Sequence, residues 1–284
     1  MRGLAYAGGV MAIPRVLSIA GSDSGGGAGI QADLKAFARC GVHGMTAITA
    51  ITVQNTLEVR AVQPVAPDIV EGQIAAVAED IGLDAIKIGM LGSVPTIEAV
   101  ERALRALSAP VPVVLDPVMI AESGGRLLDP EAERAMRELI LPLTTVATPN
   151  VAEARVLADL GADRPLEDVA RAIHGFGADA VIVTGGHRDE ATDLLFDGER
   201  FVGLPGERYP DGAAHGSGCT HASVLAAHLA HGLELEDAAR VARRIAGEAV
   251  RDGLREIGHG AGPVNVLGLG TGASGRPGGG SPLT

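Results

Sequence analysis

The sequence of 284 residues predicts an α/β fold, with a central, mostly parallel sheet covered by helices on both faces. Short β-branched apolar runs alternate with segments whose apolar residues recur at helical spacing, a pattern typical of parallel sheets built from strand–helix–strand units. The connections are short and no linker interrupts residues 13–267, so we expect one domain. A hydrophobic content of 46% with only 2% aromatic residues requires a core of Val, Ile, Leu and Ala.

The first predicted strand covers residues 15–20 and ends in the glycine-rich run 21–27. A helix follows from about Ala28, because Ile30, Leu34 and Phe37 fall on one face. The next predicted elements are a strand over 46–53, a helix over 67–79, a strand over 84–88, a helix with Ile97, Val100, Leu104 and Leu107 on one side, and a strand over 111–115.

The same alternation continues through the second half of the chain. It predicts a helix over 130–139, a strand over 145–148, helices over 151–160 and 166–176, a strand over 180–183, a β-hairpin over 194–202 with an Asp-Gly turn, and helices over 222–231 and 236–254. We expect residues 1–12 to be a disordered N-terminal extension and the Gly/Pro-rich residues 268–284 to be a flexible tail.

Composition excludes several classes of function. The net charge of −12 argues against nucleic acid and anionic membranes as partners, and no apolar run approaches the ~20 residues that span a bilayer. The N-terminus has no apolar signal core, so we expect a cytoplasmic protein with Cys40 and Cys219 as free thiols. A G-x-G-x-x-G match over 270–275 lies in the tail with no helix after it, which argues against a dinucleotide site.

The stretch 214–220 is the strongest candidate for a binding site. Small residues stand directly before a helix there, so backbone N–H groups and the helix dipole can converge on one anion, phosphate above all. Cys219 lies in this stretch, and a thiol at a helix N-terminus is expected to have a lowered pKa.

Other polar residues follow predicted strands, at the edge where ligands bind in such sheets. Asp116, Asn150 and Glu153 offer oxygen ligands suited to Mg²⁺, but Asn150 and Glu153 also fit a helix capping box. Gln54 offers the donor and acceptor that match an aminopyrimidine edge, or it simply ends a strand. Residues 25–29 could form a second phosphate cradle or a tight turn, and Asp33 alone would be a surface carboxylate.

Several motifs taken together are highly specific. They are Ala20–Lys35, Ile48–Ala50, Gln54–Thr56, Lys87–Leu91, Leu115–Met119, Thr148–Glu153, Gly185–His187, His215–Cys219 and Gly258–Pro263. In this order they closely resemble the hydroxymethylpyrimidine/phosphomethylpyrimidine kinase family of thiamine biosynthesis, over about residues 15–265.

The resemblance implies a ribokinase-like three-layer α/β/α fold and a homodimer that uses ATP and Mg²⁺. The implied reaction phosphorylates 4-amino-5-hydroxymethyl-2-methylpyrimidine and then converts the monophosphate to the diphosphate. The implied substrate-binding residues are Gln54, Asp33, Gly21, Ala28, Met90 and Val118. The implied catalytic anion hole is Gly216, Ser217, Gly218 and Cys219. The implied nucleotide-side residues are Asn150, Glu153, Thr184 and Gly186, with Asp116 and Glu153 as magnesium ligands.

Three positions depart from the family pattern. Thr184 and Glu122 stand where the family often has lysine, and 211–214 replaces a stretch that usually contains Lys and Asn-Thr. Each lost cation removes about 1 kcal/mol of attraction for a polyphosphate where it is exposed to solvent.

Three competing functions remain open from the sequence. A pyridoxal (vitamin B6) kinase would use the same scaffold. A hydrolase would use Cys219 as nucleophile with His215 or His221 as base, and a nucleotide sensor would catalyse nothing. Consumption of ATP that depends on an added pyrimidine alcohol would exclude the last two.

Overall fold

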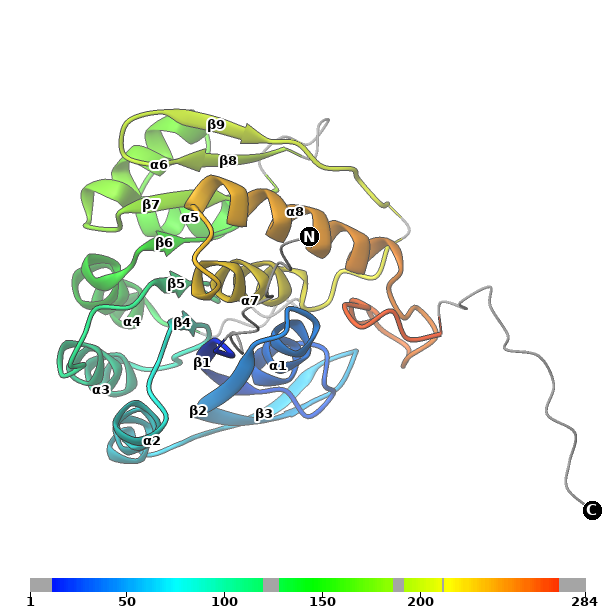
Figure 1. Ribbon diagram of the computed structural model, residues 1–284. Helices are drawn as coiled ribbons and strands as arrows, with labels where there is room; N and C mark the ends of the chain where they lie inside the picture. The colour runs from blue at the N-terminus through cyan, green and yellow to red at the C-terminus, as the bar shows by residue number, and fades with distance from the viewer. Residues whose placement is uncertain (1–11, 120–127, 186–191, 211, 271–284) are drawn as a thin grey trace, which may run out of the picture.

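The computed structural model describes residues 12–119, 128–185, 192–210 and 212–270 (Figure 1). Its centre is one nine-stranded sheet in the order β3-β2-β1-β4-β5-β6-β7-β8-β9. The six neighbours from β2 to β7 pair in parallel, and β3, β8 and β9 pair antiparallel at the two edges. The mostly parallel sheet predicted from the sequence is confirmed.

The strands are β1 Arg15–Ser22, β2 His43–Gln54, β3 Val59–Pro64, β4 Ala85–Ile88, β5 Val113–Leu115, β6 Val146–Ala147, β7 Ala180–Val183, β8 Asp193–Phe196 and β9 Phe201–Leu204. The helices of the described residues are α1 Gly29–Arg39, α2 Pro67–Asp80, α3 Val94–Arg105, α4 Pro130–Ala135, α5 Val151–Ala158, α6 Leu166–Gly175, α7 Ser217–Ala230 and α8 Leu235–Arg251.

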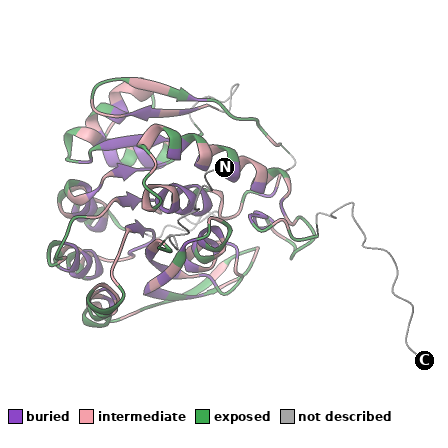
Figure 2. Ribbon diagram, in the orientation of Figure 1, coloured by how far each residue is buried: buried purple, intermediate pink, exposed green. Residues whose placement is uncertain are grey.

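Helices cover both faces of the sheet, which gives three layers (Figure 1). One apolar core joins the sheet to α2 through α6, and a second joins its opposite face to α1, α7 and α8. Figure 2 shows the central strands as buried, in agreement with the fully covered side chains of β4, β5, β6 and β7. Because both faces are covered, these strands are apolar apart from Lys87 in β4, rather than alternating.

The elements follow the predicted order with three differences. Strand β3 was not predicted, because its residues are half-buried or exposed throughout and give no strong apolar signal. The helix expected over 130–139 ends at Ala135 and continues as a π-helical turn, Met136–Ile140, and a 3₁₀ turn, Leu141–Leu143, that contains Pro142. Helix α7 begins at Ser217 rather than at residue 222.

The strand order places a candidate site at the carboxyl ends of the central strands. The chain passes from β1 to β2 on one side and then to β4 on the other side of β1. Loops that leave neighbouring parallel strands in opposite directions leave a crevice at the carboxyl ends, where ligands bind in such sheets. The glycine-rich loop after β1 and the N-terminus of α7 both lie at these carboxyl ends (Figure 1).

Some predictions fall outside the described residues. Residues 1–11 and 271–284, Glu122 and Gly186 are among these. Of the expected tail, Leu269 is anchored by two hydrogen bonds with the Asn265 side chain, both 2.8 Å. None of the helices within the described ranges is long and apolar enough to cross a bilayer.

Candidate active site

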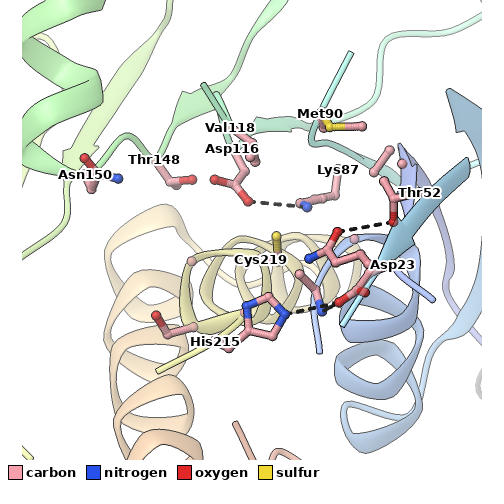
Figure 3. Close-up of a pocket in the computed structure, with 18 of the residues that line it drawn as sticks. Asp23, Thr52, Lys87, Met90, Asp116, Val118, Thr148, Asn150, His215 and Cys219 are labelled. Atoms are coloured by element: carbon pink, nitrogen blue, oxygen red, sulfur yellow. Dashed lines mark hydrogen bonds and ion pairs between the residues drawn. The ribbon is translucent and has the colours of Figure 1, made fainter. Parts of the chain in front are cut away.

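A cavity of about 300 Å³ opens at the carboxyl ends of the parallel strands (Figure 3). Its lining comes from the loop after β1, the ends of β2, β4, β5, β6 and β7, and the start of α7. The residues are Ala20–Asp23, Ala28, Gly29, Thr52, Gln54, Lys87, Met90, Asp116, Val118, Thr148, Asn150, Glu153, Thr184 and Ala214–Cys219. All the predicted site residues that the structure describes lie here except Asp33.

Asp23 shapes the glycine-rich loop on one wall of the cavity. Its carboxylate accepts the backbone N–H groups of Gly25, Gly27 and Ala28 at 2.7, 3.0 and 2.9 Å. Nε2 of His215 lies 3.2 Å from Oδ2 of the same carboxylate. Burial disfavours the charge, but the hydrogen bonds from His215 and the backbone lower the pKa of Asp23 below its ordinary value. Asp23 therefore ties this loop to the segment that leads into α7.

The N-terminus of α7 fits an anion. Gly216 has a φ of 83°, and a Cβ there would collide with the Gly27 carbonyl, so only glycine suits this close approach. The Ser217 N–H bonds the Ala214 carbonyl and the Thr220 N–H bonds the Gly216 carbonyl. The amides of Gly218 and Cys219 lie between these two and remain for a ligand. An anion at this place would therefore meet the amides of Gly218 and Cys219 rather than that of Ser217.

Cys219 lines the cavity, but the prediction of a lowered pKa is wrong for the ligand-free protein. Its side chain is buried, and burial raises the pKa of the thiol above the ordinary value. The charge of Lys87 acts in the opposite direction, while Asp116 and Asp33 raise the pKa further. Desolvation outweighs the helix dipole that the sequence argument relied on.

The prediction that Asp33 touches the substrate is also wrong. Asp33 is fully buried on α1, and its carboxylate is surrounded by Ser18, Ser223 and Lys87. The ammonium of Lys87 lies 3.1 Å from Oδ1 of Asp33 and 3.4 Å from Oδ2 of Asp116. Burial by itself would lower the pKa of Lys87, but these carboxylates hold that pKa above its ordinary value. Asp33 therefore anchors a charge beneath the cavity.

A second wall of the cavity is formed around the ends of β1 and β2. The Thr52 hydroxyl lies 2.9 Å from the Ser22 carbonyl oxygen and 3.2 Å from Oε1 of Gln54, two acceptors for its one proton, and the backbone of Gln54 is held by the Ser24 hydroxyl. Met90 packs so closely on Gly21 that a Cβ at Gly21 would lie 2.6 Å from the Met90 methyl carbon. An amide fixed beside the apolar side chains of Met90 and Val118 suits a flat ring with a polar edge.

On the opposite wall, Asn150 and Glu153 form the capping box of α5. Oδ1 of Asn150 accepts the amides of Ala152 and Glu153, and the Glu153 carboxylate accepts the Asn150 amide at 3.0 Å. The structural alternative for this pair is therefore confirmed. Glu153 nonetheless lines the cavity, and burial together with Asp116 raises its pKa to about 7.

The donor set fits a magnesium ion held partly by a ligand. No group of three or more His, Cys, Asp or Glu within the described ranges could hold a metal by itself. Two buried carboxylates, Asp116 and Glu153, nevertheless face one cavity, and the charge of Asp116 disfavours that of Glu153, which a divalent cation would offset. Mg²⁺ usually takes one or two carboxylates and completes its shell with water and phosphate oxygens.

Thr184 directly follows β7, lines the cavity and pairs with Asn150 as an isolated bridge. The next residue, Gly185, donates its N–H to Asp193 at 2.9 Å. The predicted nucleotide-side residues Thr184, Asn150 and Glu153 are therefore brought together, whereas Gly186 lies outside the described residues.

Sequence reasoning gave no role to Lys87 or Asp23. Lys87 could have been found as the single charged residue in an apolar run, because a charge on a central strand must have a buried partner. Asp23 gave a weaker signal, since an aspartate in a glycine-rich loop is ordinary turn chemistry.

The comparisons agree with this geometry. A family model described as phosphomethylpyrimidine kinase matches residues 23–265. A hydroxymethylpyrimidine/phosphomethylpyrimidine kinase of Mycobacterium bovis is 45% identical over 262 residues, which cover 90% of this chain and 95% of that one. A thiamine biosynthesis bifunctional protein of Geobacter sulfurreducens is 41% identical over 89% of this chain and 52% of its own length.

The solved structure of an ADP complex of Bacillus subtilis pyridoxal kinase has a TM-score of 0.83 and 37% identity, and covers 91% of this chain and 99% of that one. With a likeness over this share of the chain, the ribokinase-like three-layer fold expected from the sequence is confirmed. The chain belongs to the phosphomethylpyrimidine kinase family.

Proposed function

We propose that this protein is an ATP-dependent kinase that phosphorylates 4-amino-5-hydroxymethyl-2-methylpyrimidine and then its monophosphate, for thiamine biosynthesis. One observation carries the proposal: a fixed amide at Gln54 and an anion-binding helix N-terminus at Gly218–Cys219 face the same cavity. A phosphoryl group held at the helix can therefore meet an alcohol whose ring is held by Gln54. The family membership supports the same chemistry.

In the first step, the hydroxymethyl oxygen forms a bond to the γ-phosphorus while the bond from that phosphorus to the β,γ-bridging oxygen breaks. The alcohol proton leaves, and Cys219 in its thiolate form is placed to accept it. The amides of Gly218 and Cys219 stabilise the charge on the transferred group, which is the main task in phosphoryl transfer. In the second step the acceptor is a phosphate oxygen that is ionised near pH 7.

Magnesium would be held by Asp116 and Glu153 together with phosphate oxygens, where it would neutralise charge on the polyphosphate. Asp116 lies opposite the start of α7, since a Cβ at Gly218 would be 3.9 Å from its Oδ1. These carboxylates and the helix amides therefore lie on two sides of the space for the terminal phosphate.

The decisive experiment measures ADP release with ATP and Mg²⁺, with and without the pyrimidine alcohol. Release that depends on the alcohol supports the kinase, whereas alcohol-independent hydrolysis or no turnover contradicts it. The matched pair Gln54→Ala and Gln63→Ala separates binding at the cavity from loss of a surface amide, because Gln63 is exposed on β3.

Pyridoxal kinase is a second candidate, favoured by the likeness to solved pyridoxal kinases. Both acceptors are hydroxymethyl heteroaromatics, so the same cavity could take either. The kcat/KM values for the two alcohols, measured side by side, decide between them. We expect the pyrimidine to be preferred, because its amino group and ring nitrogen match the donor and acceptor of Gln54.

We also propose a cytoplasmic homodimer. Strand β3 is a sheet edge, and Ile51 and Val53 on its neighbour β2 are 54% and 55% exposed. Exposed apolar side chains beside an open edge favour pairing with a second chain. Light scattering should give twice the chain mass, and Ile51→Asp with Val53→Asp should give the monomer; a monomeric wild type contradicts the dimer.

A further inference from the structure

Lys87 occupies a position in β4 where a charge is costly. It is fully buried, and its neighbours Ile86 and Ile88 are fully buried as well. An unpaired ammonium in such a place would be strongly destabilising, so buried charges persist in proteins where they are paired.

The pairing fixes the ammonium from one side. Its distances to the two Asp33 oxygens are 3.1 and 3.2 Å. The Asp33 carboxylate also accepts the hydroxyls of Ser18 on β1 and Ser223 on α7, at 2.6 and 2.7 Å. Hydroxyls from two elements, β1 and α7, thus hold the carboxylate that contacts Lys87, and the lysine is anchored from below the cavity.

The other side of the ammonium faces the cavity. Figure 3 shows it directed toward Asp116, whose Oδ2 lies 3.4 Å away and accepts no hydrogen bond within the described ranges. Cys219 is close enough for the lysine charge to lower the pKa of its thiol. Among the described residues that line the cavity, Lys87 is the only lysine or arginine, against the carboxylates of Asp23, Asp116 and Glu153.

The choice of lysine is itself informative. Of the 23 Lys and Arg residues in the chain, only Lys35 and Lys87 are lysine. A Cβ at Gly89 would lie 2.9 Å from Nζ of Lys87, so glycine at position 89 leaves the room that the ammonium occupies. An ammonium is a compact point charge that can face two carboxylates from one place.

We propose that Lys87 is a positioning residue of the phosphoryl-transfer site, whose ammonium fixes the Asp116 carboxylate and supplies fixed positive charge beside Cys219. The inference rests on the proposed kinase function. Charge spreads over the transferred group in the transition state, and preorganised charge stabilises it there. Loss of the ammonium should therefore lower kcat, while the KM of the alcohol, which is set around Gln54, should change little.

The first test compares Lys87→Met with Arg15→Met. Arg15 pairs with Asp84 at the opposite end of β1 and β4, so it controls for loss of a cation and of stability on the same strands. Lys87→Met should lower kcat about 10²- to 10³-fold, as for removal of one preorganised donor, with the KM of the alcohol within about threefold. Arg15→Met should lower Tm and keep kcat. A Lys87→Met enzyme with kcat within about threefold of wild type overturns the proposal.

Chemical rescue separates charge from packing. Ethylammonium should restore part of kcat to Lys87→Ala, whereas ethanol, of similar size and without charge, should not. Equal rescue by both, or by neither, overturns the role of the charge.

A measurement on the wild type remains decisive if the variants fail to fold. In an NMR spectrum, ¹⁵N-lysine labelling gives two side-chain signals, which the variant Lys35→Arg assigns. Addition of Mg-ADP should change the chemical shift of the Lys87 signal. An unmoved Lys87 signal in a protein that binds Mg-ADP overturns the proposal. Absence of alcohol-dependent ADP release in the wild type overturns only the kinase function, because the labelling experiment needs no turnover.

Discussion

Replacing Cys219 by alanine should slow transfer to the alcohol far more than transfer to the monophosphate. The alcohol must lose a proton as its oxygen bonds to phosphorus, and a positioned base contributes about 10²- to 10⁴-fold to such a step. The monophosphate presents an oxygen with a second pKa of about 6, so it needs no base near neutral pH. We therefore expect a loss of at least about 100-fold in the first step and less than about tenfold in the second.

The burial of Cys219 adds a pH dependence. Burial raises the pKa of this thiol above the ordinary value, which is about 8.5 for free cysteine. The thiolate is then a minor species at pH 7.5, and its fraction grows about tenfold for each pH unit below the pKa. The rate of the first step should rise in this way between pH 7 and 9, while the second step should stay nearly level.

The assay follows ADP release with each acceptor at saturation, from pH 6.5 to 9.5. Cys40→Ala is the matched control, since Cys40 is a free, half-buried thiol outside the cavity, with a pKa raised to about 11; it should leave both profiles unchanged. Equal losses in the two steps of Cys219→Ala would refute the reasoning. So would a first-step rate that still rises with pH after the thiol is gone.

Three further outcomes are expected. Gln54→Ala should raise the KM of the alcohol about tenfold, the equivalent of one hydrogen bond, with the KM of ATP unchanged in the same initial-rate data; a shift in both would contradict its assignment. Thr184→Lys should lower the KM of ATP about fivefold, as expected for about 1 kcal/mol from one exposed cation, and an unchanged KM would show that position 184 does not face the phosphates. The pKa of Glu153 is about 7 when folded against about 4.3 unfolded, so the folded form keeps a proton that the unfolded form has lost. The free energy of unfolding should therefore fall as pH rises from 4.5 to 7, by up to about 3 kcal/mol, and urea titrations of Glu153→Gln without Mg²⁺ should show no such fall.

The parts of the fold that were predictable are those with local signals. Strand β7 is a continuous apolar run, β1 is apolar over residues 16–20 except for Ser18, and the helical spacing of α3 was clear, so their places were predicted within a few residues. Strand β3 was not predicted because it is held by backbone pairing with β2 across residues 50–64. Its side chains are mostly exposed and therefore give no apolar pattern. The early start of α7 escaped because its first turn is Ser-Gly-Cys-Thr, which has no apolar periodicity.

The features of the site that depend on local backbone conformation were predictable from the sequence. Those that depend on how deeply a side chain is buried in the tertiary structure were not. The glycines around position 216 predict a close approach of two backbone segments, and in the structure the backbone of Gly216 lies against the Gly27 carbonyl. Asp33 has the same local sequence whether it faces solvent, substrate or Lys87, and only the packing of α1 against β1 and α7 selects the last. Likewise, the pKa of Cys219 depends on how deeply α7 is buried, which no local pattern encodes.

The distribution of charge explains how this chain can do without a lysine at position 184. On the proposed function, a lysine there would approach the polyphosphate from the nucleotide side, on a long side chain that can follow the ligand. Lys87 instead lies on a central strand, held by Asp33 and unable to follow a ligand. A fixed charge contributes little to capturing ATP from solution but needs no reorganisation when charge develops in the transition state. We therefore propose that the arrangement favours turnover over nucleotide affinity, and that a magnesium ion held by Asp116 and Glu153 would supply most of the attraction for the bound polyphosphate.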